Sequence, residues 1–205
     1  MTRCTLIPAA LVMLLASCGL APAADPRHPD WPCVQAKVPE ISLAAVWSGP
    51  PIDDVGRRWE DDPKIKELVA RVAPRRTQLE DAQKEIADFL AGDSAAKLER
   101  ARLLFGGLFE VLNRERADVM SGIERLARRQ KQFIEKIQSD TAKLREMQDA
   151  ADRDAARFEE LSSQIEWSTR ILEDRRRTVR YVCEVPVMIE RRLFAFGRAI
   201  QQALD

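Results

Sequence analysis

The feature that most constrains the fold of this chain is a seven-residue repeat of apolar side chains that begins near residue 94. One stripe starts at Leu98 and continues to Ala203, and a second stripe starts at Phe109 and continues to Ile200. Heptads sustained over this length are typical of coiled coils. The pattern therefore predicts long helices that pack on one another along a shared apolar seam.

Both stripes weaken in a polar run over residues 148–154. A short connection between antiparallel helices is the usual way to turn such a chain. We therefore expect an all-α fold built on a long antiparallel helical hairpin or coiled coil, with helices at about 94–148 and 155–205. No Gly or Pro falls between Gly122 and Pro186, so a single helix of about 170 Å is the alternative.

A third helix is expected over residues 63–91, packed at the base of the hairpin. Asp62 suits the N-cap of that helix, and Pro63 suits its first helical position. Apolar residues recur at helical spacing from there, and Pro74 is a position where the helix would kink. Gly92 suits its C-terminal end. Residues 63–205 together form the predicted helical domain.

Residues 24–62 predict an extended N-terminal arm rich in proline and tryptophan. Proline at this density disfavours regular helix. Gly106 and Gly107 would each cost about 1 kcal/mol inside a helix, and close approach of the arm or of another helix would explain them. We expect the arm to lie along the helices with its tryptophans as anchors; an exposed aromatic surface that binds glycan or a partner is the alternative. The three tryptophans are Trp31, Trp47 and Trp59.

The first residues have the composition of an export signal. Arg3 precedes an apolar stretch of the length expected of such a signal, and an A-x-A processing site ends at Ala23. Residues 1–23 therefore predict a signal peptide. The four residues that end at Cys18 also resemble the lipobox of bacterial lipoproteins, in which the cysteine becomes the lipid-modified first residue. In that alternative the signal ends at Ser17 and Cys18 is the lipidation site.

Because Cys18 is either lipidated or removed, the cysteines left to pair after either cleavage are Cys33 and Cys183. An even pair in an exported protein predicts a disulfide bond. That bond would pin the arm to a late helix. A metal site formed by His28, Asp30 and Cys33 is the alternative. No C-x-x-C or haem-attachment spacing is present.

Charge and motifs exclude several classes of function. The 205 residues carry 33 Lys plus Arg and 33 Asp plus Glu, so the formal net charge is zero. A nucleic-acid binder would show a basic excess. The chain has one histidine, and it contains no phosphate-binding loop, dinucleotide fingerprint or nucleophile elbow. We therefore expect no cofactor, no metal and no enzymatic activity.

Trp167 falls outside both apolar stripes, on the far half of the predicted hairpin. An exposed tryptophan there would anchor a protein partner or a second subunit. These features predict a periplasmic or lipid-anchored scaffold or adaptor in the envelope of a Gram-negative bacterium, and the stripes would equally serve a homo-oligomer. The alternative is a soluble periplasmic chaperone. Its general form would be similar to the Skp family of holdases, whose helical prongs extend from an oligomeric base that includes strands, although that family is basic and this chain is neutral.

Overall fold

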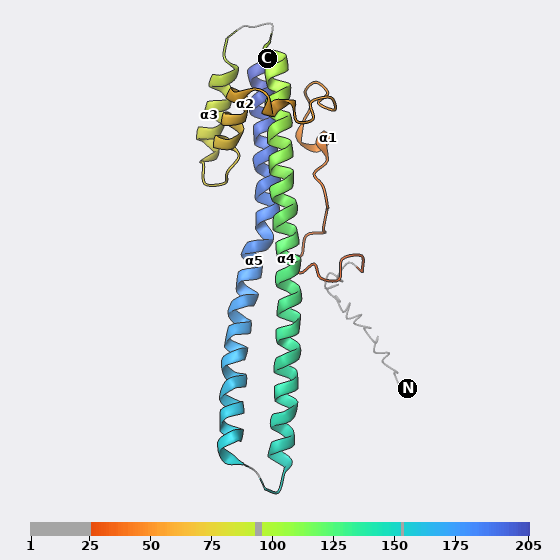
Figure 1. The fold of residues 1–205 in the computed structure, drawn as a ribbon, viewed down its shortest axis with the longest axis vertical. Coiled ribbons are helices and arrows are strands. Elements are labelled where there is room, and N and C mark those ends of the chain that lie inside the picture. The colour runs from red at the N-terminus through yellow and green to blue at the C-terminus, as the bar shows by residue number, and fades with distance from the viewer. Residues whose placement is uncertain (1–25, 93–95, 153) are drawn as a thin grey trace, which may run out of the picture.

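The computed structural model describes residues 26–92, 96–152 and 154–205, and it confirms the all-α hairpin. About 75% of these residues are helical and none lies in a strand. Helix α4 (Lys97–Asp149) packs antiparallel on helix α5 (Ala155–Leu204), and Figure 1 shows the two as one long rod. The predicted signal peptide, its cysteine Cys18 and the expected start of the second helix at residue 94 lie outside the described residues.

The turn of the hairpin falls where the polar run predicted it. Helix α4 ends at Asp149, Ala150 is extended, and the Asp154 carboxylate caps α5 by accepting a hydrogen bond from the backbone N–H of Arg157 at 3.1 Å. Asp is among the best N-cap residues because its side chain satisfies an otherwise unpaired N–H group. At 1.5 Å per residue, the 53 residues of α4 make a rod of about 80 Å.

The prediction of one third helix over residues 63–91 is wrong. Two short helices, α2 (Pro63–Val72) and α3 (Leu79–Leu90), fold back on one another at the base. Pro74 has no N–H group with which to continue the α2 ladder, so the chain turns there. Thr77 then donates its hydroxyl to the Arg71 carbonyl at 2.9 Å and closes the turn.

A buried arginine fixes α2 against the hairpin. The Arg192 guanidinium donates to the carbonyl of Val72, the last residue of α2, at 2.6 Å, and lies 4.9 Å from the centroid of the Phe196 ring. Burial of the guanidinium lowers the pKa of Arg192 from its usual value. A cation suits this place because the C-terminal carbonyls of a helix carry partial negative charge.

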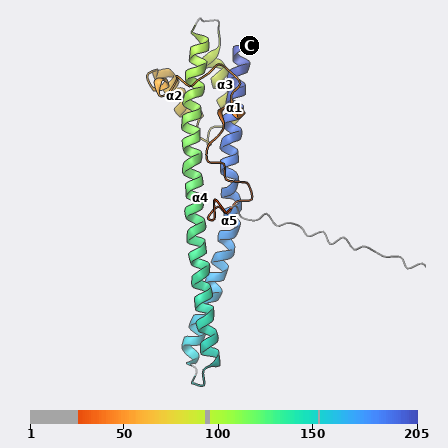
Figure 2. The same ribbon diagram turned by 90° about the vertical axis from the view of Figure 1, so that its right-hand side faces the viewer.

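The arm runs from the middle of the hairpin to its base. Figures 1 and 2 show it along the side of the hairpin away from α2 and α3. Most of the arm is irregular, but it is not wholly extended: a single helical turn, α1 (Leu43–Val46), and a 3-10 turn, η1 (Arg58–Glu60), interrupt it. Helix α1 forms within the stretch between Pro39 and Pro50, where the sequence is free of proline.

The hydrophobic core lies at the base and unites the arm with all of the longer helices. Phe105 of α4 and Phe196 of α5 are fully buried in it, and Trp47 of the arm stacks on Phe105 with ring centroids 4.2 Å apart. Trp59 is also buried there. The expected anchoring of the arm by tryptophan is therefore confirmed for Trp47 and Trp59.

The arm explains two of the helix glycines. A Cβ atom on Gly106 would lie 2.5 Å from a Val55 methyl carbon, and one on Gly107 would lie 2.8 Å from the Trp59 ring. The arm thus packs directly on the α4 backbone at these two residues. Close approach by the arm, one of the two predicted explanations for the glycine pair, is confirmed.

These contacts predict opposite effects for two glycine-to-alanine substitutions within one helix. We expect Gly107→Ala to lower the free energy of unfolding by about 1–3 kcal/mol, because the added methyl overlaps the Trp59 ring. At Gly122 the nearest atom to a new Cβ is 3.7 Å away, so Gly122→Ala should raise stability by about 0.5–1 kcal/mol through helix propensity. Urea unfolding of both variants measures the two changes in unfolding free energy. Changes of the same sign would contradict the prediction.

Candidate protein-binding surface

The arm is fastened to the hairpin by a disulfide and a series of polar contacts. Cys33 and Cys183 are bonded, with Cα atoms 5.5 Å apart, as the cysteine count predicted. Toward the turn, Asp30 pairs with Arg128 at 3.1 Å. Toward the base, the buried guanidinium of Arg116 on α4 contacts both α5 and the arm. It donates to Glu190 of α5 at 2.6 Å and to the Pro39 carbonyl of the arm at 3.2 Å.

This arrangement accounts for one of the polar interruptions of the apolar stripes. Arg116 occupies a core position of α4, where an apolar side chain would serve hairpin packing alone. Its guanidinium instead holds an arm carbonyl and a carboxylate of α5 at once. The described part of the arm ends near the middle of the hairpin, and α4 and α5 continue beyond it to the turn (Figure 1).

One face of α5 carries an exposed apolar row. Trp167 is 64% exposed, Tyr181 is 78% exposed and Met188 is 53% exposed. Trp167 and Tyr181 are separated by two heptads, and Met188 follows after one more, so the three share one side of the helix. The prediction that Trp167 lies outside the hairpin seam is therefore confirmed. Sequence reasoning missed Tyr181 and Met188, although their spacing from Trp167 was a readable signal.

A second row of exposed side chains lies beside the first on α5: Arg170, Arg177, Glu184 and Arg191. Each of these residues lies three positions after a member of the seven-residue series 167, 174, 181 and 188 that contains the first row, and the first three also lie four positions before the next member. Residues three and four apart are neighbours on a helix surface, so the two rows form one continuous face. Its charged members include both signs, and Arg170 already pairs with Glu166. We call this the α5 face; it comprises Trp167, Arg170, Asp174, Arg177, Tyr181, Glu184, Met188 and Arg191.

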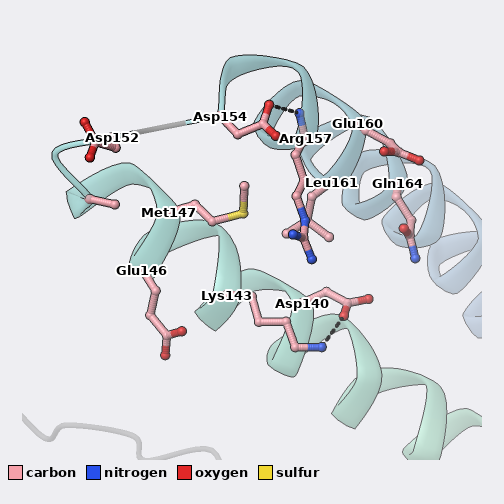
Figure 3. Close-up of a pocket in the computed structure, with 11 residues that line it drawn as sticks. Asp140, Lys143, Glu146, Met147, Asp152, Asp154, Arg157, Glu160, Leu161 and Gln164 are labelled. Carbon is pink, nitrogen blue, oxygen red and sulfur yellow. Dashed lines mark hydrogen bonds and ion pairs between the residues drawn. The ribbon is translucent and has the colours of Figure 1, made fainter.

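The described part of the hairpin tip contains a shallow polar hollow. Its volume is about 570 Å³, and it lies between the last turns of α4 and the first turns of α5. Figure 3 shows Met147 and Arg157 extending into the gap, whereas Asp152 lies on the connecting turn and Glu146 points away. Among the described residues, no group of three acidic, histidine or cysteine side chains is placed to hold a metal ion.

Asp140, at the edge of this hollow, is held in its charged form. Lys136 donates to it at 2.6 Å, and Lys143 lies 3.4 Å away. The hydrogen bond from Lys136 lowers the pKa of Asp140 below its usual value, against the opposing effect of desolvation. Lys136 and Lys143 both lie within one turn of Asp140 on α4, so these ion pairs stabilise the helix locally.

The lowered pKa predicts how Asp140 contributes to acid stability. Its ion pairs stabilise the fold at any pH above the carboxyl pKa of the unfolded chain, and that contribution is lost as the pH falls through the lower pKa of the folded protein. Asp140→Asn should therefore flatten the dependence of the melting temperature on pH in the acid range. Identical acid profiles for the two proteins, measured by circular dichroism, would contradict this.

A second hollow, of about 700 Å³, lies between the arm and α4 near the base. Its walls are mostly apolar, and two of its polar side chains bind the arm. Glu110 accepts from the Trp59 indole N–H at 2.9 Å and from Arg114. Asn113 accepts from the Ile41 N–H at 3.3 Å. Glu110 and Asn113 thus help to hold the arm in place.

The remaining sequence-predicted site residues have clear positions. The disulfide takes the sulfur of Cys33 that a site with His28 and Asp30 would need, so that alternative is wrong. Trp31 is only partly covered, and its indole N–H donates to the Gln35 carbonyl within the arm at 2.7 Å. The lipidation site predicted at Cys18 lies outside the described residues.

The chain matches no known protein family, no curated protein sequence and no solved structure. Within the described ranges, no helix combines the length and the apolarity that a membrane crossing requires. The disulfide bond indicates a compartment that is not reducing.

Proposed function

We propose that this protein is an exported, non-enzymatic scaffold or adaptor of the cell envelope that binds a protein partner along the α5 face. The observation that carries the proposal is the exposed row Trp167, Tyr181 and Met188. Large aromatic side chains dominate protein interfaces because they bury much area at small cost in side-chain entropy. The long hairpin and its tethered arm make a rigid support for such a surface.

The periplasm is the proposed location, with lipidation of Cys18 as the proposed membrane anchor. The disulfide is compatible with that compartment. The arm would join the anchor to the hairpin near its middle, because Asp30 contacts Arg128 and Cys33 is bonded to Cys183. An intact mass of the protein from envelopes tests the anchor: a chain that starts at Cys18 with added acyl mass supports it, and a start near Ala24 contradicts it.

Site-specific photo-crosslinking in cells tests the binding surface. A photoreactive residue at Tyr181, on the α5 face, should capture a partner protein in the envelope. The matched control is position Arg176, which is also exposed but lies about 90° or more around α5 from this face. Capture should be lost when Trp167 and Met188 are both changed to serine. Equal capture from positions 176 and 181 would contradict the proposal.

The holdase alternative stays a prediction and has its own test. A holdase slows the aggregation of many unfolded outer-membrane proteins, whereas an adaptor recognises a particular folded surface. The purified protein should leave such aggregation unchanged if the scaffold proposal is right. Suppression of aggregation that is weakened by Trp167→Ser would favour the holdase.

A further inference from the structure

The apolar stripes that might have served a homo-oligomer are used within one chain. Residues of both stripes, such as Leu112, Ile123, Leu172 and Ile189, are buried in the monomer. A second copy of the chain must therefore bind through a surface outside the hairpin seam. The α5 face, with Trp167 at 64% exposure, is such a surface.

Charge is segregated along the projecting hairpin although the whole chain is neutral. Residues 125–136 of α4 and 170–183 of α5 lie side by side and carry ten basic against three acidic side chains, a net charge of +7. We call this region the basic belt. All ten basic side chains are exposed: Arg125, Arg128, Arg129, Lys131, Lys136, Arg170, Arg175, Arg176, Arg177 and Arg180.

The end of the hairpin has the opposite sign. Residues 137–169, which we call the acidic tip, carry eight acidic against four basic side chains, a net charge of −4. Few of these charges neutralise the belt within the chain. In the described structure, the ion pairs between tip and belt are Lys136 with Asp140 and Arg170 with Glu166. Arg176, Arg177 and Arg180 have no ion-pair partner among the described residues.

Trp167 lies on α5 where the acidic tip adjoins the basic belt. In α5 it lies ten residues from Arg157 in the tip and ten residues from Arg177 in the belt. If two α5 helices lie antiparallel with their Trp167 residues together, residues 159 and 160 of one copy fall beside residues 175 and 174 of the other. The tip of each copy then covers the belt of its partner. A parallel pair would instead place one belt of +7 on the other.

We propose that two copies of this chain pair antiparallel along the distal hairpin, with Trp167 beside Trp167 at a two-fold axis and the acidic tip of each copy on the basic belt of the other. The arrangement is isologous, so the two tip-to-belt contacts are equivalent and the contact closes on itself. The buried tryptophans at the centre supply the apolar anchor, and the charges around them select the antiparallel orientation. Asp174 lies within the belt and opposes Glu160, and the neighbouring Arg175 and Arg177 outnumber it.

Exposed ion pairs are individually weak and are screened by salt over about 10 Å at 0.1 M ionic strength. The pairing should therefore weaken as salt rises. Trp167→Ala should raise the dimer dissociation constant about 30-fold, the effect of losing an interface hot spot. Phe194→Ala is the matched control: it also removes an exposed aromatic ring from α5, but near the base, and should leave the constant unchanged.

The deciding experiment is sedimentation velocity of the full mature chain with charge-reversed variants. Arg170→Glu with Arg177→Glu, both on the α5 face, makes a belt-reversed chain, and Glu159→Lys with Glu160→Lys makes a tip-reversed chain. Each variant alone should be monomeric under conditions in which the wild type dimerises. An equimolar mixture of the two should dimerise again. In the mixed pair, the lysines introduced at positions 159 and 160 lie across from the glutamates introduced in the belt of the other chain, and the second tip-to-belt contact keeps its wild-type charges.

Three outcomes would overturn the inference: a wild-type monomer at low salt, a dimer indifferent to charge reversal, or no recovery in the mixture. The inference shares the α5 face with the proposed function, and the two fail separately. A monomer in sedimentation removes the pairing and leaves capture of another protein at Tyr181 as the test of the adaptor role. Cross-links at Tyr181 that join only copies of this chain would contradict the adaptor role and support the pairing.

Discussion

Replacing both Cys33 and Cys183 by serine should lower the free energy of unfolding by up to about 5 kcal/mol. The bond closes a loop of 150 residues, and in the chain-entropy model a loop of this length restricts the unfolded chain by about that amount. In the folded protein the same bond holds the start of the arm, whose later residues Trp47 and Trp59 are part of the core.

Urea unfolding of the double serine variant and the wild type, each followed by circular dichroism, measures this effect. The wild type with reductant is the matched comparison and should lose as much stability as the variant. Far-ultraviolet spectra should stay alike under native conditions, because α4 and α5 pack along a seam that does not need the bond. A loss below about 1 kcal/mol would show that the polar contacts of Arg116 and Arg128 hold the arm without the disulfide.

Phe105→Ala should cost about 3–5 kcal/mol of unfolding free energy. The ring is fully buried, stacks on Trp47 at 4.2 Å between centroids and lies 6.3 Å from the Phe109 ring. Removing it leaves a cavity where α4, α5 and the arm meet, next to Gly197, whose Cα faces the Val46 carbonyl. The rigid backbone contact at that glycine limits how far the cavity can collapse.

Phe194→Ala is the control for this prediction, since the same atoms are removed from a ring that is 46% exposed on α5. Its cost should stay below about 1 kcal/mol, because surface substitutions remove little buried area. Chemical denaturation of both variants, with the disulfide intact, makes the comparison. Similar losses in the two variants would mean that Phe105 does not centre the core.

Particular residues show how far sequence reasoning reached. The polar run before Asp154 located the hairpin turn, and the cysteine pair located the disulfide, because both depend on local composition or on counting. The sequence predicted a kink at Pro74, but the chain reverses its direction there. Whether a helix bends or turns back at a proline depends on what its two halves can pack against, and that surface belongs to α4 and α5.

Some features of the candidate surface could be predicted from the sequence, and others depend on the fold. The exposure of Trp167 follows from its position outside the heptad stripes, and that position can be read from the sequence. The basic belt does not, because residues 125–136 and 170–183 are far apart in the chain and meet only through the turn. The role of Arg116 was hidden for a similar reason: its two acceptors, Pro39 and Glu190, come from opposite ends of the sequence.

The sequence by itself determined the helical class of this protein, its hairpin and its cysteine pair. Heptad periodicity and turn composition act between neighbours along the chain, so they can be read without coordinates. The tertiary structure alone decided where the arm lies, which glycines it covers and how charge gathers along the hairpin. These features depend on side chains that are distant in sequence, and their energies exist only once the folded chain has brought them into contact.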